Sequence, residues 1–127
     1  MVKQIKTDNA PAAIGPYSQA VVANGFIFVS GQLPLDPKSG QLVEGDMPIQ
    51  TKRVIDNLEA ILQAAGSSLD KVVRIDVFLK DLERDFPAMN AVYATRFSKT
   101  SPPARQTIQA AKLPLNAPIE ISCVALI

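Results

Sequence analysis

The stretch Ala20-Val21-Val22-Ala23-Asn24-Gly25-Phe26-Ile27-Phe28-Val29 decides the fold, because it places a tight turn between two short apolar runs. Asn-Gly tolerates positive φ at both central positions of a type I′ turn, and the twist of that turn matches the twist of the flanking strands. The stretch therefore predicts a β-hairpin. The residues after Ser30-Gly31 are expected to form a loop, because prolines and glycines interrupt them at Pro34, Pro37, Gly40 and Gly45.

A helix is expected after this loop, between Asp46 and Gly66. Asp46 is a suitable N-cap, Pro48 fits the first helical turn, and Gly66 ends the pattern. Apolar residues recur at helical spacing and form one face: Val54, Ile55, Leu58, Ile61, Leu62 and Ala65. The opposite face is polar: Lys52, Arg53, Asp56, Glu59 and Gln63. Such a helix packs its apolar face on a neighbouring element.

A strand and a second helix are expected next. Residues Val72–Leu79 alternate, which predicts a strand with Val73, Ile75, Val77 and Leu79 on one side and Arg74 and Asp76 on the other. In the second helix we expect Asp85 as the N-cap and Pro87 in the first turn. Its apolar stripe consists of Phe86, Met89, Val92, Tyr93 and Phe97.

Two short strands close the chain, over Ala104–Gln109 and over 119–125. With a first strand within residues 1–6, the predicted order is strand, hairpin, helix, strand, helix, strand, strand. Two amphipathic helices that lie beside strands are typical of an α+β fold in which both helices pack on one face of a single sheet. At 127 residues the chain fits one domain, over residues 1–127.

Several predicted strands are apolar on both sides. The hairpin carries apolar residues on opposite faces: Phe26 and Phe28 against Ile27 and Val29. The last strand shows a mixed face: Glu120, Ser122, Val124 and Leu126. Two helices cover only one face of a sheet, and an apolar second face is usually hidden in a subunit interface. We therefore expect a homo-oligomer.

The composition limits the class of function. Thirteen basic and twelve acidic residues give a formal net charge of +1, without a run of five like charges, so nucleic-acid or membrane binding has no electrostatic support. Residues 1–6 do not show a basic patch followed by an apolar stretch, and no later segment approaches about 18 apolar residues. We expect a cytoplasmic protein.

The chain contains no histidine, which excludes a Ser-His-Asp triad, a Cys-His pair, a His-bound zinc and a two-histidine ribonuclease mechanism. Acid–base chemistry must then come from carboxylates, lysine, tyrosine or bound water. The single cysteine, Cys123, cannot form an internal disulfide, in agreement with a reducing compartment. Its place in an apolar alternating strand favours a buried small side chain over a reactive thiol.

Arg105 and Glu120 are the strongest candidates for chemistry. Arg105 lies in a short strand among small and uncharged residues, where its planar guanidinium suits a carboxylate or a phosphate. A surface or interface salt bridge is the alternative interpretation. Glu120 lies between Ile119 and Ile121, a setting that raises the pKa of a carboxyl group or reserves it for a partner. Its alternative is a pair with a lysine or arginine of the same sheet.

Tyr17, Ser30, Gly31 and Asn90 are further candidates for a ligand site. Tyr17 would enter the hairpin from a tight turn, and Ser30-Gly31 ends the second hairpin strand with a glycine that permits close approach of a ligand. Asn90 lies near the start of the second predicted helix. Each also has a structural interpretation: a half-buried tyrosine, a strand-ending turn and a solvated helix residue.

Taken together, these segments resemble the RidA family of reactive intermediate deaminases, also called YjgF, nearly from end to end. The matching segments are Asn9-Ala10-Pro11-Ala12-Ala13-Ile14-Gly15-Pro16-Tyr17-Ser18-Gln19-Ala20, Ser30-Gly31-Gln32, Met89-Asn90-Ala91-Val92-Tyr93, Pro103-Ala104-Arg105 and Ile119-Glu120-Ile121. Their order and spacing together are highly specific. The resemblance implies a chorismate-mutase-like α+β fold with a single mixed sheet, assembled as a homotrimer with three sites in the clefts between subunits.

The resemblance also implies an activity, the hydrolysis of 2-aminoacrylate and related 2-enamino or 2-imino acids to 2-keto acids and ammonia without a metal or other cofactor. Such substrates are made by pyridoxal-phosphate enzymes. By the same resemblance, Arg105 binds the substrate carboxylate and Glu120 holds and activates the attacking water. The remaining implied lining residues are Tyr17, Ser30, Gly31, Asn90 and Thr107. An imine carbon is already electrophilic, so fixing the carboxylate, relaying a proton and aiming a water suffice.

Two residues depart from the pattern of this family. Thr107 stands where some members carry cysteine, and we expect its backbone carbonyl to do the positioning, so that activity survives while substrate preference shifts. Ser122 replaces an acidic residue often found in the closing strand, which changes the charge balance of that strand more than the site.

Other functions described for this family remain as alternatives: binding of small carboxylates or regulation of a partner without catalysis, and ribonuclease activity or inhibition of translation. The nuclease alternative is the weakest, because the chain has no histidine, no acidic metal-binding cluster and a net charge of only +1. A binding module would use the same arginine cleft to hold a stable keto acid. Catalytic turnover distinguishes the deaminase from the binder.

Overall fold

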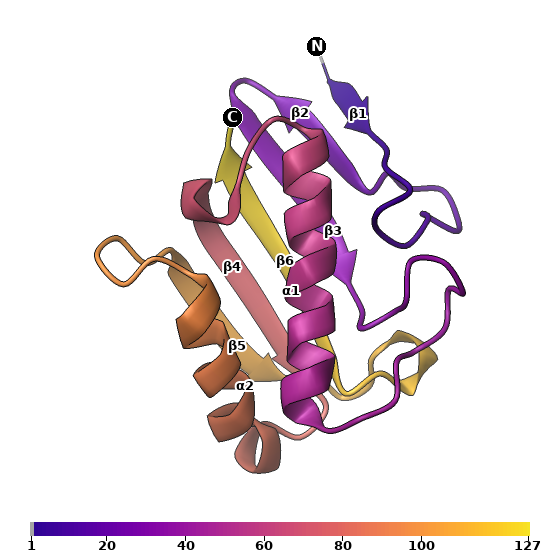
Figure 1. Cartoon of the computed structure of the whole chain (residues 1–127), viewed down its shortest axis with the longest axis vertical. Coiled ribbons are helices and arrows are strands. Elements are labelled where there is room, and N and C mark those ends of the chain that lie inside the picture. The colour runs from indigo at the N-terminus through magenta and orange to yellow at the C-terminus, as the bar shows by residue number, and fades with distance from the viewer. Residues whose placement is uncertain (1) are drawn as a thin grey trace.

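The computed structural model describes residues 2–127, so that Met1, at the start of the predicted N-terminal strand, lies outside the described residues. In chain order the elements are β1 (Lys3–Ile5), β2 (Ala20–Ala23), β3 (Phe26–Gln32), α1 (Met47–Ala64), the 3₁₀ turn η1 (Leu69–Lys71), β4 (Val72–Leu79), α2 (Leu82–Arg96), β5 (Ala104–Gln109), the 3₁₀ turn η2 (Pro114–Asn116) and β6 (Ile119–Leu126) (Figure 1).

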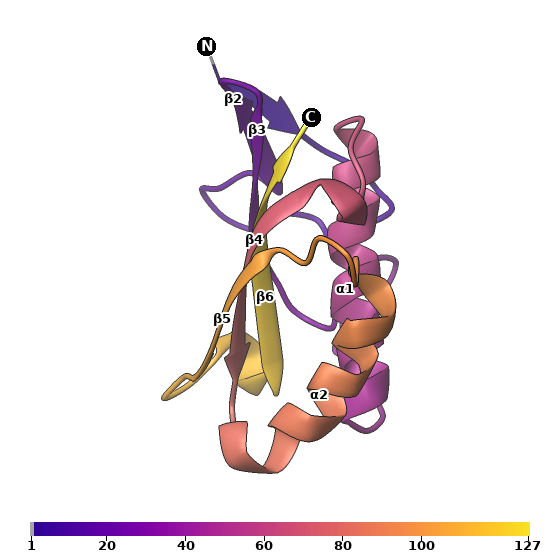
Figure 2. The same cartoon turned by 90° about the vertical axis from the view of Figure 1, so that its left-hand side faces the viewer.

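The strands form one six-stranded mixed sheet in the order β1-β2-β3-β6-β4-β5. Only β4 and β5 pair in parallel, and every other neighbouring pair is antiparallel. Figure 2 shows both helices on the same side of this sheet. The predicted α+β architecture, with two helices on one face of a mixed sheet, is confirmed. Across residues 2–127, we find no helix with the length and apolar character needed to cross a membrane.

The hairpin between β2 and β3 has the predicted geometry. Asn24 has a φ of 52° and Gly25 a φ of 82°, as a type I′ turn requires. This turn sets the register, in which Val22 pairs with Ile27. Ile27 is consequently buried under the helices, whereas Phe28 points to the opposite face and is exposed.

The first helix, α1, also matches its prediction. Asp46 caps it by accepting a hydrogen bond from the backbone N–H of Ile49, and Gly66, with a φ of 83°, follows its last turn. Five of its apolar side chains are inaccessible to solvent: Val54, Ile55, Leu58, Ile61 and Leu62. They belong to the main core, which lies between α1, α2 and the sheet.

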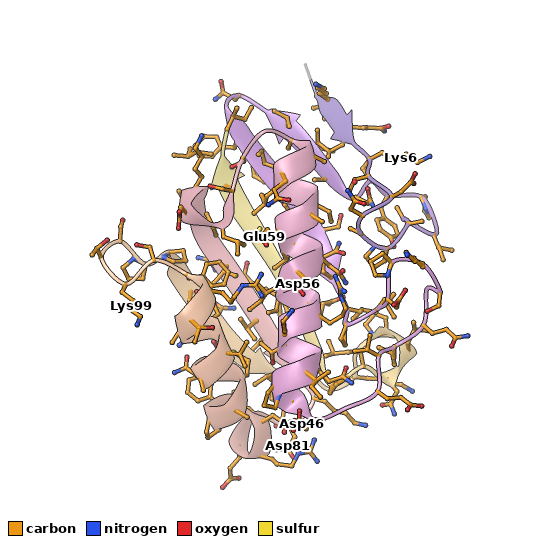
Figure 3. All side chains as sticks on the ribbon, in the orientation of Figure 1. Lys6, Asp46, Asp56, Glu59, Asp81 and Lys99 are labelled. Carbon is orange, nitrogen blue, oxygen red and sulfur yellow. The ribbon has the colours of Figure 1, made fainter. Side chains whose placement is uncertain are left out.

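The second helix, α2, begins earlier than predicted, and the assignment of Asp85 as its N-cap is wrong. Asp81 is the cap, because its carboxylate accepts a hydrogen bond of 3.0 Å from the backbone N–H of Arg84. Asp85 instead lies buried in the first turn and accepts two hydrogen bonds from the Arg84 guanidinium. Pro87 is therefore inside the helix and not in its first turn. The two observed caps, Asp46 and Asp81, lie at the same end of the molecule (Figure 3).

The predicted alternation of β4 fails at its start. Val73, expected among the buried residues, is 39% exposed, while Val72 is buried. The cause is a register shift against β6 between Val72 and Arg74, which inserts an extra residue and reverses the faces before it. From Ile75 onward the prediction holds, since Ile75, Val77 and Leu79 are buried.

The face of the sheet away from the helices, here called the outer face, is only partly covered. A second small core of Leu33, Leu113 and Ala117 packs with Phe78 and closes one part of it. Elsewhere large apolar side chains remain exposed, including Phe28 at 45% and Leu126 at 42%. This is the exposed apolar face that the sequence predicts.

Candidate functional site

Arg105 lies on β5, an edge strand of the sheet, and reaches toward α2. It pairs in register with Ile75, whose side chain is buried under the helices, so Arg105 is on the helix side of the sheet. Its Nη1 donates a hydrogen bond of 2.6 Å to Oδ1 of Asn90. Its Cζ lies 4.6 Å from the ring centroid of Tyr93 and 5.6 Å from that of Phe86. Within residues 2–127 no carboxylate pairs with Arg105, which leaves most of its donors for a ligand.

The guanidinium of Arg105 borders a pocket of about 640 Å³, here called the Arg105 pocket. Its lining residues come from α2, from the loop after α2 and from β5: Asn90, Tyr93, Ala94, Phe97, Ser98, Lys99, Pro102, Pro103 and Arg105. The Tyr93 side chain is buried, and this burial raises the pKa of its phenol although the charge of Arg105 acts in the opposite direction. The pocket therefore combines a cation with a neutral aromatic wall.

Glu120 lies on β6 and points to the outer face. It pairs in register with Phe78, whose side chain packs in the small outer core. The Glu120 carboxyl is half-buried, no basic side chain pairs with it among residues 2–127, and burial raises its pKa. The pair with a basic residue of the same sheet, an alternative left open by the sequence, is therefore not formed within the described part of the chain.

A bulge in β3 brings Gly31 against the Glu120 carboxyl. The pairing of β3 with β6 shifts between Val29 and Gln32, so that two residues of β3 oppose one of β6. A Cβ at position 31 would lie 2.8 Å from Cδ and 3.0 Å from Oε2 of Glu120. Only a residue without a side chain permits this approach, because a Cβ would collide with the carboxyl. The backbone at Gly31 does not have a positive φ, so this contact, and not backbone conformation, calls for glycine here.

Tyr17 and Ser30 complete a cleft of about 510 Å³ beside Glu120, here called the Glu120 cleft. The Ser30 hydroxyl donates to the carbonyl of Ser18 at 2.6 Å, which ties β3 to the segment before β2. Tyr17 is 54% exposed and stands in the wall of the cleft with Gly31 and Glu120. The cleft therefore contains an ionisable carboxyl, a phenol and backbone groups at a bulge.

Gln19 is a site residue that the sequence reasoning did not single out. It is 3% exposed, and its amide nitrogen donates to the carbonyls of Thr7 and Pro11 at 3.0 and 2.8 Å while its oxygen accepts from the backbone N–H of Thr7 at 2.7 Å. These bonds hold the N-terminal loop that carries Tyr17. The only sequence signal was a glutamine directly before the apolar run of β2, which does not reveal a buried amide.

The structure places the predicted site residues in two groups. Tyr17, Ser30, Gly31 and Glu120 line the Glu120 cleft, and Asn90 and Arg105 line the Arg105 pocket. Asn90 was predicted near the start of the second helix, but it lies in the middle of α2, because this helix begins at Leu82. Thr107 lines neither pocket, and its Oγ1 is buried without a hydrogen-bond partner among the described residues. Its side chain shares the helix side of the sheet with Val77.

Cys123 is a core residue, as the sequence favoured. It is buried at 3% exposure, and this burial raises the pKa of its thiol to about 12. The thiol is therefore protonated and inert at neutral pH.

These observations define a class of protein: a two-helix α+β domain with an arginine that has no carboxylate partner among residues 2–127 on one side of its sheet and a half-buried glutamate in a cleft on the other. The chain belongs to the L-PSP family, also called the Rid family, because residues 7–127 match the family model described as endoribonuclease L-PSP. The predicted membership of the RidA family is thereby confirmed.

Named relatives support this assignment. A RutC family protein of Pyrococcus horikoshii is 49% identical over 125 residues, which cover 98% of each chain. Reactive Intermediate Deaminase A of Arabidopsis thaliana, a chloroplastic protein, is 47% identical over 121 residues, covering 95% of this chain and 64% of the relative. The family thus includes proteins named as deaminases.

Solved structures show the same fold. A putative endoribonuclease of Thermotoga maritima superposes with a TM-score of 0.94 at 46% identity, covering 98% of this chain and 97% of the other. TdcF of E. coli, crystallised with bound serine, superposes with a TM-score of 0.90 at 35% identity, covering 98% of each chain.

Proposed function

We propose that this protein is a deaminase that hydrolyses 2-aminoacrylate and related 2-imino acids to 2-keto acids and ammonia. The observation that carries the proposal is the pair of half-sites: a guanidinium without a carboxylate partner, and a half-buried glutamate without a cation, within residues 2–127. We propose the cytoplasm as its location, since the single cysteine of the sequence is a buried thiol and forms no internal disulfide.

In the proposed reaction, Arg105 binds the substrate carboxylate. Asn90 already occupies one edge of its guanidinium, so the remaining N–H groups are free to donate in parallel to two carboxylate oxygens. This bidentate contact fixes the imine carbon next to the water that attacks it. The contribution of Arg105 is therefore binding and orientation.

Glu120 is proposed to act on the water. Its carboxylate accepts a proton from the water while the water oxygen bonds to the imine carbon, and it passes that proton to the imine nitrogen to give a neutral carbinolamine. Glu120 then takes the hydroxyl proton and delivers it to the amino nitrogen, so that the carbon–nitrogen bond breaks, ammonia leaves and the hydroxyl oxygen becomes the keto oxygen. A raised pKa suits the first step, because a more basic carboxylate takes a proton from water more readily.

The two half-sites require a second copy of the chain, because Arg105 and Glu120 point to opposite faces of one sheet. We propose that the protein is a homotrimer in which the Arg105 pocket of one subunit meets the Glu120 cleft of the next. The exposed apolar residues of the outer face support this assembly. The names of the relatives support the chemistry, since one is a reactive intermediate deaminase and the E. coli structure holds serine, which carries an α-carboxylate.

A non-catalytic binder of small carboxylates is the second candidate, favoured by the same free guanidinium. The ribonuclease alternative has no comparable support, since the sequence has no histidine and a net charge of +1.

A coupled assay separates the deaminase from the binder. Threonine dehydratase releases an imine, and we expect this protein to accelerate its decay in proportion to protein concentration, with 2-ketobutyrate and ammonia as products. Tight binding of 2-ketobutyrate without acceleration would leave only the binder.

Mixing two variants of low activity tests whether the site is shared between subunits. In a randomly assembled 1:1 mixture of Arg105→Lys and Glu120→Gln chains, about a quarter of shared sites would contain both native residues. We therefore expect activity to return to about a quarter of the wild-type rate after co-refolding. A mixture as inactive as its components would show that both residues act within one chain.

A further inference from the structure

We infer that Tyr93 is a positioning residue for Arg105: the face of its ring fixes the plane of the guanidinium so that the free donors meet the substrate carboxylate. The inference rests on the proposed function, because it assigns a role in presenting Arg105 to that substrate. The spacing of Tyr93 in the sequence indicates only a member of the apolar stripe of α2, whereas in the structure its ring lies against Arg105.

Tyr93 and Asn90 hold the guanidinium in two complementary ways. They are three residues apart on α2, which places both on the same side of the helix. Asn90 accepts from Nη1 at 2.6 Å and so fixes one in-plane direction of the group. The ring of Tyr93, with its centroid 4.6 Å from Cζ, supports the guanidinium from one face. Together, Asn90 and Tyr93 determine both the direction and the plane of the Arg105 guanidinium.

Tyr93 is itself held rigidly. Its side chain is 8% exposed, and its ring stacks on that of Phe97 with a centroid distance of 4.5 Å and an interplanar angle of 26°. Arg105 therefore lies over a ring that is itself held by its contact with Phe97. A flexible arginine on an edge strand loses side-chain entropy when it binds a ligand, and a fixed aromatic face reduces that cost by restricting the arginine beforehand.

The contact with Arg105 is made by the ring and not by the hydroxyl. The Tyr93 hydroxyl is buried and has no hydrogen-bond partner among residues 2–127. The other cation that borders the pocket, Lys99 on the loop after α2 (Figure 3), carries the same charge as Arg105 and does not attract it. Phe86 lies farther from Cζ, at 5.6 Å. The ring of Tyr93 is thus the nearer of the two aromatic supports, which predicts that phenylalanine replaces it and leucine does not.

The test compares Tyr93→Leu with Tyr93→Phe, with Val92→Ala as a control for loss of apolar burial on α2. In Tyr93→Leu we expect KM for the imine and the Kd for 2-ketobutyrate to rise about 2- to 30-fold, the range of one cation–π contact, while kcat changes less. Tyr93→Phe should restore both constants to near wild-type values. Val92→Ala should leave both unchanged.

Nuclear magnetic resonance gives a readout that does not depend on activity, and the wild-type spectrum by itself tests the inference even if the leucine variant does not fold. In wild-type protein the Arg105 side-chain protons should be shifted upfield by the ring current, and rotation of the guanidinium should be slow enough to separate its Nη signals. Arg105→Lys assigns these signals by removing them. They should persist in Tyr93→Phe and collapse in folded Tyr93→Leu.

The outcomes distinguish the inference from the proposed function. If wild-type protein neither hydrolyses imines nor binds 2-ketobutyrate, the proposed function fails whatever the spectra show. If wild-type protein is active but its Arg105 signals are averaged and unshifted, the positioning role is wrong. Equal KM and Kd values in wild type and a folded Tyr93→Leu would overturn it as well.

Discussion

Arg105 and Glu120 lie on opposite faces of the same sheet. Arg105 pairs with Ile75 on the helix side, and Glu120 pairs with Phe78 on the outer face, because side chains on adjacent strands share a face when they are in register. One chain therefore cannot close a site around a small substrate with both residues. Catalysis by Arg105 and Glu120 at one site would therefore require an oligomer.

The first prediction concerns assembly. Wild-type protein should sediment as a trimer at micromolar concentration, whereas Phe28→Glu, which places a charge on the exposed outer face, should give folded monomers without imine hydrolase activity. Sedimentation equilibrium and circular dichroism measure the two properties. Ile49→Glu is the matched control, since Ile49 is 51% exposed on α1 and should tolerate the charge. A monomeric wild-type protein with full activity would refute the shared site.

The second prediction concerns Arg105. Arg105→Lys keeps the charge but loses the planar fork, the bond to Asn90 and the stacking on Tyr93. We expect kcat/KM to fall about 10- to 100-fold with every 2-imino acid, as for loss of a hydrogen bond to a charged group. The coupled imine-decay assay measures this loss. Wild-type kcat/KM values in Arg105→Lys would mean that Arg105 does not bind the substrate.

The third prediction concerns Glu120. Glu120→Gln preserves size and hydrogen bonding but not basicity, so the variant should assemble and bind 2-ketobutyrate while turnover falls about 10²- to 10⁴-fold. Calorimetric titration gives the binding, and the coupled assay gives the rate. Near-normal turnover would contradict water activation. Loss of both binding and turnover in an intact trimer would make Glu120 a ligand-holding residue and favour the binder.

The fourth prediction concerns pH. Burial raises the pKa of Glu120 above the ordinary glutamate value of 4.5, and only the ionised carboxylate accepts a proton from water. Activity should therefore be lost as the pH falls through this raised pKa, at a pH where an ordinary glutamate is still ionised. The measurement is kcat/KM against pH after subtraction of the uncatalysed decay.

A charge placed near Glu120 tests whether this residue causes the acid limb, that is, the fall of kcat/KM at low pH. Ser122 is two residues from Glu120 on the same face, so Ser122→Asp should raise the Glu120 pKa further and move the limb to higher pH. Ser122→Asn should leave it in place. Identical profiles for all three proteins would assign the limb to another group.

The fifth prediction concerns Gly31. In Gly31→Ala the new Cβ would collide with the Glu120 carboxyl, 2.8 Å from Cδ, while the backbone conformation at position 31 suits alanine. The carboxyl must move, so we expect stability close to wild type and turnover reduced about 10²-fold, the effect of misplacing a reacting group by about 1 Å. Thermal unfolding measures the stability of the variant, and the coupled assay measures its turnover. Ser122→Ala, on the same face but without this contact, should stay active.

Part of this structure could be predicted from the sequence, because it depends on the chemistry of neighbouring residues. The Asn24-Gly25 turn required its hairpin, because both residues tolerate positive φ. Asp46 and Gly66 bounded α1 for similarly local reasons. The motif segments identified the family and the pair of residues, Arg105 and Glu120. The turn and the helix caps depend on neighbours within a few positions of the chain, which is why the sequence alone determines them.

Where two signals competed, the sequence could not choose. Asp81 and Asp85 are both suitable caps, and only the observed bond from Arg84 to Asp81 decides between them. Val72 and Val73 are both apolar, and only the register shift against β6 decides which is buried. These outcomes depend on how α2 and β4 pack against partners that are distant along the chain.

Tertiary structure alone decided how the site residues are distributed. Alternation along a strand shows which of its own residues share a face, but the pairing of strands shows which face that is and what lies opposite. The bulge at Ser30-Gly31 set Gly31 against Glu120, and the packing of α2 on α1 placed Tyr93 under Arg105. Both contacts join residues far apart in sequence, and hydrogen bonding between strands and packing between helices, not local propensity, determine their distances.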